Sequence, residues 1–115
     1  MPCMRSKPPH KGNNKMIIKK HIDREGKVVL AVCDDYVKGK CFKEDGLQLD
    51  LSSNFYDGDK KSEEEIIEMI KEAYIVNMAG ENSVNLGIRA GIIDEDKVLR
   101  IEGIPHAEAV IVREE

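Results

Sequence analysis

The sequence contains no tryptophan and no threonine, a single glutamine, and only five aromatic residues among its 115. Its longest uninterrupted apolar run, residues 28–33, is six residues long, whereas a membrane-spanning helix needs about 20. There is also no basic and apolar leader that ends in a small-residue cleavage site. These absences predict a cytoplasmic protein that does not contact a membrane.

The composition is that of an ordinary globular chain, with 41% hydrophobic and 35% charged residues. A chain of this length buries roughly two thirds of its unfolded surface, so its core needs no disulfide and no metal. The polar residues are mostly Lys and Glu, and thirteen isoleucines accompany them, which is typical of heat-adapted proteins. We therefore expect one domain without a structural cofactor.

Residues 1–15 differ from the rest of the chain. Proline, glycine and asparagine interrupt them, and they hold four cations, no acid and few large apolar side chains. Such a segment cannot offset its ordering entropy by burial. The sequence therefore predicts a disordered basic tail over residues 1–15 and a single α+β domain over residues 16–115.

Alternating and β-branched segments predict the first strands. Apolar residues alternate over 16–22, as in a strand with one buried face, and 27–33 is a nearly continuous apolar run, as in a strand buried on both faces. A short polar turn between them predicts a central hairpin. A second turn signal, Asp45-Gly46, precedes the alternating leucines of 47–51, which predict another strand.

Two helices and two more strands are expected in the second half. The Ser-Glu-Glu-Glu sequence at 62–65 is a capping box, and apolar residues spaced by three and four extend the predicted helix to Gly80. A second helix is expected over 82–91, or as a bent continuation of the first, followed by extended segments at 98–102 and 107–113. This order predicts an α+β two-layer sandwich, with a mixed or antiparallel sheet covered on one face by two helices.

Charge is divided unevenly along the chain. Residues 1–43 hold eleven Lys and Arg against four acids, whereas residues 44–115 hold seven against eighteen. Clustered cations bind nucleic acid because they release its counterions, so a basic face on the N-terminal hairpin predicts contact with RNA. Loop aromatics can stack a base. The candidate RNA contacts are Lys19, Lys20, Arg24, Lys27, Lys38, Lys40, Phe55 and Tyr56. The competing interpretation is a solvated surface of mixed charge, with the two aromatics packed between sheet and helices.

A second set of residues can carry chemistry if the fold brings them into one pocket. Its members are cysteines, acids, an amide and a histidine in the loop predicted at 103–106: Cys33, Asp34, Cys41, Asn77, Glu81 and His106. Each also has an ordinary structural interpretation, such as a buried cysteine, a capping aspartate or a packed histidine. Seven residues separate Cys33 from Cys41, which is unlike the cysteine spacing of zinc sites, so we expect no metal.

Several short motifs occur together in a characteristic order. They are Ala31-Val32-Cys33-Asp34, Gly39-Lys40 with Phe42, Phe55-Tyr56, Asn77 with Gly80-Glu81, and Pro105-His106-Ala107. In this order and spacing the chain resembles, over residues 16–113, the archaeal family called domain of unknown function 424. The resemblance implies an archaeal origin, a single α+β domain, no known cofactor and an association with translation or RNA handling. It transfers no catalytic residue.

Three functional hypotheses follow. The first is a non-catalytic accessory module that contacts RNA or a ribonucleoprotein through the basic hairpin. The second is a small enzyme or ligand-binding protein that uses Cys33, Asp34, Cys41 and His106. The third is a protein-interaction module, such as a homodimer that joins exposed sheet edges.

Overall fold

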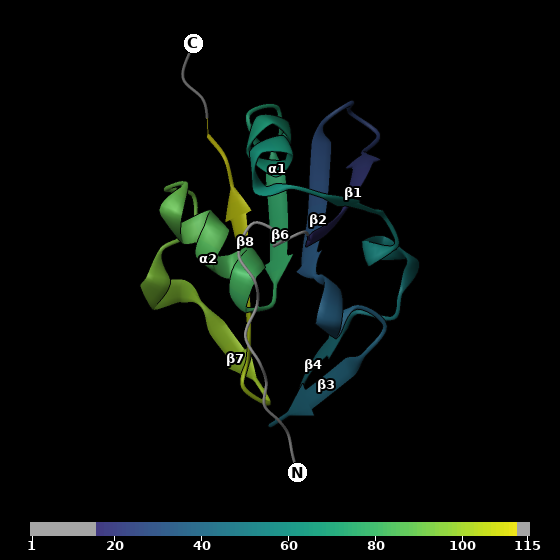
Figure 1. Cartoon of the computed structure of the whole chain (residues 1–115), viewed down its shortest axis with the longest axis vertical. Helices are drawn as coiled ribbons and strands as arrows, with labels where there is room; N and C mark the ends of the chain where they lie inside the picture. The colour runs from purple at the N-terminus through teal and green to yellow at the C-terminus, as the bar shows by residue number, and fades with distance from the viewer. Residues whose placement is uncertain (1–15, 113–115) are drawn as a thin grey trace.

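A computed structural model describes residues 16–112 of the chain, so the predicted tail at 1–15 lies outside the described residues. These residues form an α+β domain around a six-stranded sheet of order β5-β1-β2-β6-β8-β7 (Figure 1). Neighbouring strands run antiparallel except β2 and β6, which are parallel. The strands are β1 (Met16–Ile22), β2 (Val28–Asp34), β5 (Asp59–Lys61), β6 (Ile75–Ala79), β7 (Leu99–Ile101) and β8 (Ile104–Val110).

The hairpin predicted at the start of the domain is present as β1 and β2. Its register pairs Met16 with Asp34 and Ile22 with Val28. The turn is closed by Asp23, whose carboxylate accepts hydrogen bonds from the backbone N–H groups of Glu25 and Lys27. This is the local bonding that favours aspartate in turns.

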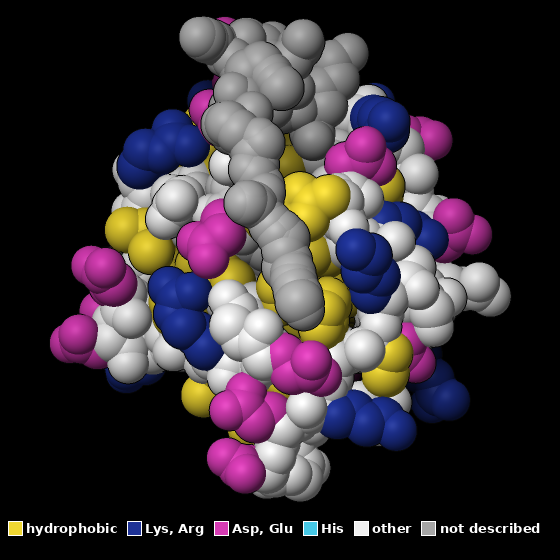
Figure 2. All heavy atoms as spheres, turned by 60° about the horizontal axis from the view of Figure 1, so that its bottom comes forward, with side chains coloured by type: hydrophobic (Ala, Val, Ile, Leu, Met, Phe, Trp, Pro, Cys, Tyr) yellow, Lys and Arg dark blue, Asp and Glu magenta, His cyan; other side chains and the backbone are white. Residues whose placement is uncertain are grey.

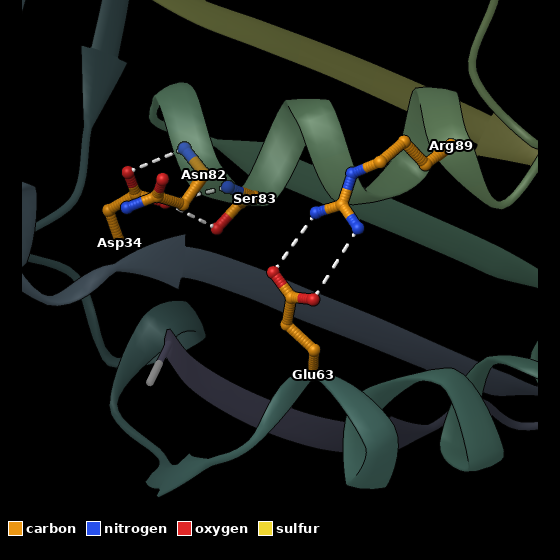
Figure 3. Close-up of polar contacts among 5 residues, drawn as sticks. All are labelled: Asp34, Glu63, Asn82, Ser83 and Arg89. Carbon is orange, nitrogen blue, oxygen red and sulfur yellow. Dashed lines mark hydrogen bonds and ion pairs between the residues drawn. The ribbon is translucent and has the colours of Figure 1, made fainter. Parts of the chain in front are cut away.

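Two helices cover one face of the sheet, α1 (Glu63–Ile70) and α2 (Glu81–Arg89) (Figure 1). The predicted capping box begins α1, because the Ser62 hydroxyl accepts from the Glu65 N–H and the Glu65 carboxylate accepts from the Ser62 N–H. Arg89 links the end of α2 to Glu63 at the start of α1 through contacts of 3.4 and 3.0 Å (Figure 3). In the described residues no helix is long and apolar enough to span a membrane.

The helix predicted to run to Gly80 ends at Ile70 instead, and residues 75–79 form the central strand β6. Their apolar residues fit the spacing of a helix, but Ile75 and Val76 are β-branched and pair with Val29 and Leu30 of β2. Tertiary pairing therefore decides the structure here. The second predicted helix is a separate element, α2, and Gly80 lies between β6 and α2.

The prediction of two layers did not include a second hydrophobic core, which lies on the other face of the sheet. A two-stranded sheet of β3 (Cys41–Glu44) and β4 (Leu47–Asp50), with the 3-10 turns η1 (Asp35–Val37) and η2 (Asn54–Tyr56), packs there. We call this the second core. It contains Ile17, Ala31, Cys33, Val37, Leu49, Leu51, Tyr56, Ala79 and Ile101.

The last strand begins earlier than predicted. A two-residue turn, Glu102-Gly103, joins β7 to β8, and both residues have positive φ, 54° and 80°. Such turns match the twist of the flanking strands. His106 therefore lies within β8, not in a loop at 103–106. A third 3-10 turn, η3 (Glu95–Lys97), precedes β7.

Candidate functional site

The cations expected to form one basic face are spread over the molecule. Lys19 and Lys20 are consecutive in β1, so their side chains point to opposite faces of the sheet. Lys19 pairs with Ala31 on the side of the second core, whereas Lys20 pairs with Leu30 on the side of the helices. No single surface can therefore present both.

The other cations lie at opposite ends of β2. Arg24 and Lys27 are in the turn before this strand, and Lys38 and Lys40 follow it, about 20 Å away along seven residues. Lys27 contacts Glu25 at 3.3 Å and the Tyr74 ring. At the end that carries the β3–β4 hairpin, blue and magenta side chains alternate around apolar atoms (Figure 2). Mixed charge, the competing interpretation, describes this surface.

The two aromatic candidates already have partners. The Phe55 ring stacks on His21 with 4.6 Å between centroids and 9° between planes, and the His21 Nε2–H donates to the Phe55 carbonyl at 3.0 Å. Tyr56 is 5% exposed and lies in the second core. Both rings pack on the face away from the helices: Tyr56 is buried, and the half-buried Phe55 ring has one face against His21.

The six pocket candidates fall into three separate places. Cys33, Asn77 and His106 lie on the face of the sheet away from the helices, because the register aligns Cys33 with Ala79 and Ala79 with His106. Asp34 and Glu81 lie at the start of α2. Cys41 is exposed on β3. Across residues 16–112, no three His, Cys, Asp or Glu side chains group as metal ligands.

Asp34 is buried and caps α2 across 48 residues of sequence (Figure 3). Its carboxylate accepts from the Asn82 N–H at 2.8 Å, the Ser83 N–H at 2.7 Å and the Ser83 hydroxyl at 2.8 Å. Burial raises the pKa of Asp34, and these hydrogen bonds oppose the rise. Gly80 makes room, since a Cβ there would lie 2.5 Å from the Asp34 Cγ. The carboxylate occupies the helix N-terminus that could otherwise hold an anion.

Cys33 is a poor nucleophile in this setting. It is fully buried, and desolvation raises its pKa to about 12, with the neighbouring Asp34 charge adding to the rise. The reactive form of cysteine is the thiolate, which this environment disfavours. Cys33 thus acts as a small apolar residue of the second core.

The sheet face opposite the helices is only partly covered. On β2 and β6, the residues facing the helices, Leu30 and Val76, are 0% exposed, whereas Val29 and Ile75 on the other side are half-buried. The second core covers this face at Ala31 and Cys33, and Phe55, packed against that core, covers His21. We call the remainder the open face. It consists of Lys19, Val29, Ile75, Asn77, Glu108 and Val110, with Leu99 and His106 at its β7 end.

The open face has an apolar row beside a polar row. Val29, Ile75 and Val110 align across β2, β6 and β8. The neighbouring register aligns Lys19, Ala31, Asn77 and Glu108, of which Ala31 is buried under the second core. One cation and one carboxylate thus lie three strands apart, about 14 Å.

Two titratable side chains on this side of the sheet, His106 and Tyr56, are held neutral. Burial lowers the pKa of His106, although the nearby Glu108 charge opposes this, so the ring is neutral at neutral pH. Burial also raises the pKa of Tyr56, with the neighbouring Cys33 adding to the rise. Uncharged donors and acceptors therefore border the single charges of the polar row.

Most of the open face was missed by the sequence candidates. Ile75 was not chosen because residues 75–79 fit a helix, and Glu108 and Val110 were not chosen although they lie within the strand predicted at 107–113. Alternation over residues 104–110 is a signal that could have placed Glu108 and Val110 with His106.

The fold and the open face together define a small α+β protein with one partly covered side of its sheet. The family model described as "Protein of unknown function (DUF424)" matches residues 21–112, so the chain belongs to this family. The crystal structure of an uncharacterized conserved protein from Methanopyrus kandleri is similar, with 27% identity and a TM-score of 0.72. The match covers 88% of this chain and 95% of that one. A search of curated proteins found no match.

Proposed function

We propose that this protein is a non-catalytic accessory module that binds a protein partner on its open face. The observation that supports this is the contrast between the two sides of β2 and β6. Leu30 and Val76 are fully buried under the helices, whereas the opposite row of Val29 and Ile75 is half-exposed beside Val110, which is 56% exposed. Apolar side chains gathered on one surface are typical of binding sites.

The chemistry of the face favours protein over RNA as the partner. Sheets that bind RNA present exposed aromatic rings and several cations. Here the aromatic rings are packed, and Lys19 is the one Lys or Arg among the side chains of the open face. Contact with RNA or a ribonucleoprotein through the N-terminal cations stays a competing prediction, which the experiment below separates.

The polar row specifies what the partner presents. Lys19 attracts a carboxylate and Glu108 attracts a cation, about 14 Å apart. Asn77, next to Glu108 and two strands from Lys19, can both donate and accept hydrogen bonds. The partner is therefore a protein surface with an apolar centre and one charge of each sign on its rim.

Two of the groups that the enzyme hypothesis would need are engaged in the fold. Asp34 holds the start of α2, and Cys33 is buried as a thiol. These engagements support a binding role over catalysis.

The test is site-specific photocrosslinking in cells of the source organism. A crosslinking amino acid is placed at Lys19 or Leu99, on two sides of the open face, and at two exposed control positions elsewhere, Ile22 and Leu47. A second arm carries Asn77→Arg, which places a bulky cation in the centre of the face. Its matched control is Leu47→Arg.

We expect the same protein to be captured from Lys19 and Leu99, to be absent from the controls, and to be lost with Asn77→Arg but kept with Leu47→Arg. Nuclease treatment should leave capture unchanged. Capture that disappears with nuclease indicates an RNA-held partner and contradicts the proposal. Equal capture from all four positions, or none from the open face, also contradicts it.

A further inference from the structure

We infer that two copies of this protein pair through the outer edge of β8, which joins their sheets into one. This goes beyond the proposed function, because it concerns the edge of the sheet and a second copy of the same chain. Pairing of β8 with β7 ends at His106. Beyond it, no described strand lies along the outer edge of residues 107–110.

The direction of the backbone in β8 follows from two hydrogen bonds. The Gly80 N–H donates to the Pro105 carbonyl, and the Ile111 N–H donates to the Tyr74 carbonyl. Odd-numbered residues of β8 therefore turn their backbone groups toward β6. Because these groups alternate along a strand, Glu108 and Val110 turn theirs outward. An edge with free backbone groups is a template for another strand.

Exposed apolar side chains surround this edge. Six large apolar side chains are exposed in the described residues, and three of them, Leu99, Val110 and Val112, lie along β7, β8 and its continuation. All three point to the open face, because Leu99 pairs with His106 and side chains of alternate residues share a face. Val112 is 81% exposed. A strand added here would cover Val110 and Val112.

Charge selects how a second copy can pair. With Glu108 opposite Glu108 of the second copy, two like charges would face each other, and a register centred on Ala109 would place them diagonally adjacent. A two-fold axis at Val110 avoids both. It sets Val110 against Val110 and Glu108 against Val112 of the second copy, and separates the two Glu108 residues by four positions, about 13 Å.

This register joins outward backbone groups at positions 108, 110 and 112 of both copies. It closes on itself, as a two-fold interface does, so it gives a dimer and not a fibre. The contact is small, so we expect a weak dimer with a Kd on the order of 100 μM.

The first test is sedimentation of the full chain over a wide concentration range, with variants at the axis. Val110→Lys and Val110→Glu each place like charges opposite each other, and each should weaken the dimer about tenfold or more. An equimolar mixture of the two should restore it, because the axis then pairs a cation with a carboxylate. The matched controls, Ile22→Lys and Ile22→Glu, change an exposed residue at the far end of β1 and should leave the dimer unchanged.

The second test checks the register by disulfide trapping in a chain without Cys3 and Cys41. In this register the Cα atoms of the two Val110 residues lie about 5.5 Å apart, so Val110→Cys places two cysteines at a distance that suits a disulfide. The two residues at position 112 lie about 13 Å apart, which is too far for Val112→Cys to form one. Oxidation should therefore crosslink the first variant and not the second. Circular dichroism of every variant establishes that it is folded before it is compared.

A full chain that stays monomeric at about 1 mM overturns the inference, as does a dimer indifferent to the charge at position 110 or a mixture that is not restored. These results are independent of the partner experiment. Asn77 lies on β6, one strand inward from the edge, and Asn77→Arg changes no residue of β8. It should therefore leave the dimer intact, so loss of the partner and loss of the dimer are distinguishable.

Discussion

Asp34 caps α2, and we expect removal of this cap to lower the free energy of unfolding strongly. Asp34→Ala removes the acceptor of three hydrogen bonds of 2.7–2.8 Å. Loss of a helix cap costs about 1–2 kcal/mol. The Ser83 amide and hydroxyl, which are fully buried, would lose their partner as well, at about 1–3 kcal/mol. We therefore expect the free energy of unfolding to fall by about 3 kcal/mol.

The measurement is urea denaturation followed by circular dichroism. The dependence of the unfolding free energy on urea concentration should be the same for each variant, so that a shift of the midpoint reports stability. Asp34→Asn keeps the shape and one acceptor oxygen, but turns an NH₂ group toward the Asn82 N–H, so we expect a smaller loss of about 1–2 kcal/mol.

The matched control for these variants is the next residue in the chain. Asp35 is 53% exposed and pairs with Lys60 at 3.2 Å, so Asp35→Ala should change stability by less than about 0.5 kcal/mol. If Asp34→Ala costs no more than Asp35→Ala, the buried cap does not stabilise the fold and the reasoning is wrong.

Three further predictions concern Gly80, the cysteines Cys33 and Cys41, and His106. Gly80→Ala should cost at least about 2 kcal/mol more than Gly91→Ala in the same denaturation assay, because both have positive φ but only Gly80 would clash with a carboxyl group. Iodoacetamide at neutral pH should alkylate exposed Cys41 in the native protein and Cys33 only after unfolding, as mass spectrometry of the peptides would show. NMR titration should place the His106 pKa below 6.5. Because the unfolded chain then binds a proton more readily, His106 stabilises the fold fully above pH 6.5, and this contribution should be lost as pH falls through its folded pKa.

Elements defined by local sequence could be predicted, and those defined by distant pairing could not. The first hairpin and the Ser62 cap depend on residues that are close in sequence. Strand β6 depends on β2, more than 40 residues earlier, and its own residues fit a helix equally well. The same distant register brings Cys33, Asn77 and His106 onto one face, which no spacing in the sequence indicates.

The prediction of one basic face conflicted with the strand pattern of the same residues. The alternation that indicates a strand at 16–22 also places Lys19 and Lys20 on opposite sides of it. The role of Asp34 was one of the alternatives considered. Its helix could not be identified in advance, because Asn82 and Ser83 approach it only when β2 and β6 are paired.

The sheet order assigns the two halves of the chain to the two halves of the sheet. Residues up to 61 supply β5, β1 and β2, and residues from 75 supply β6, β8 and β7. The molecule is thus built like a heterodimer of two fragments. They are joined by the parallel pair β2 and β6, by Asp34 reaching across it, by hydrogen bonds of Glu102 with Lys43 and Glu44, and by two cores to which both fragments contribute. A chain cleaved between Lys61 and Ser62 would leave each fragment with its own three strands. Mixing the fragments should reconstitute the fold, because the strand pair and the two shared cores then form again.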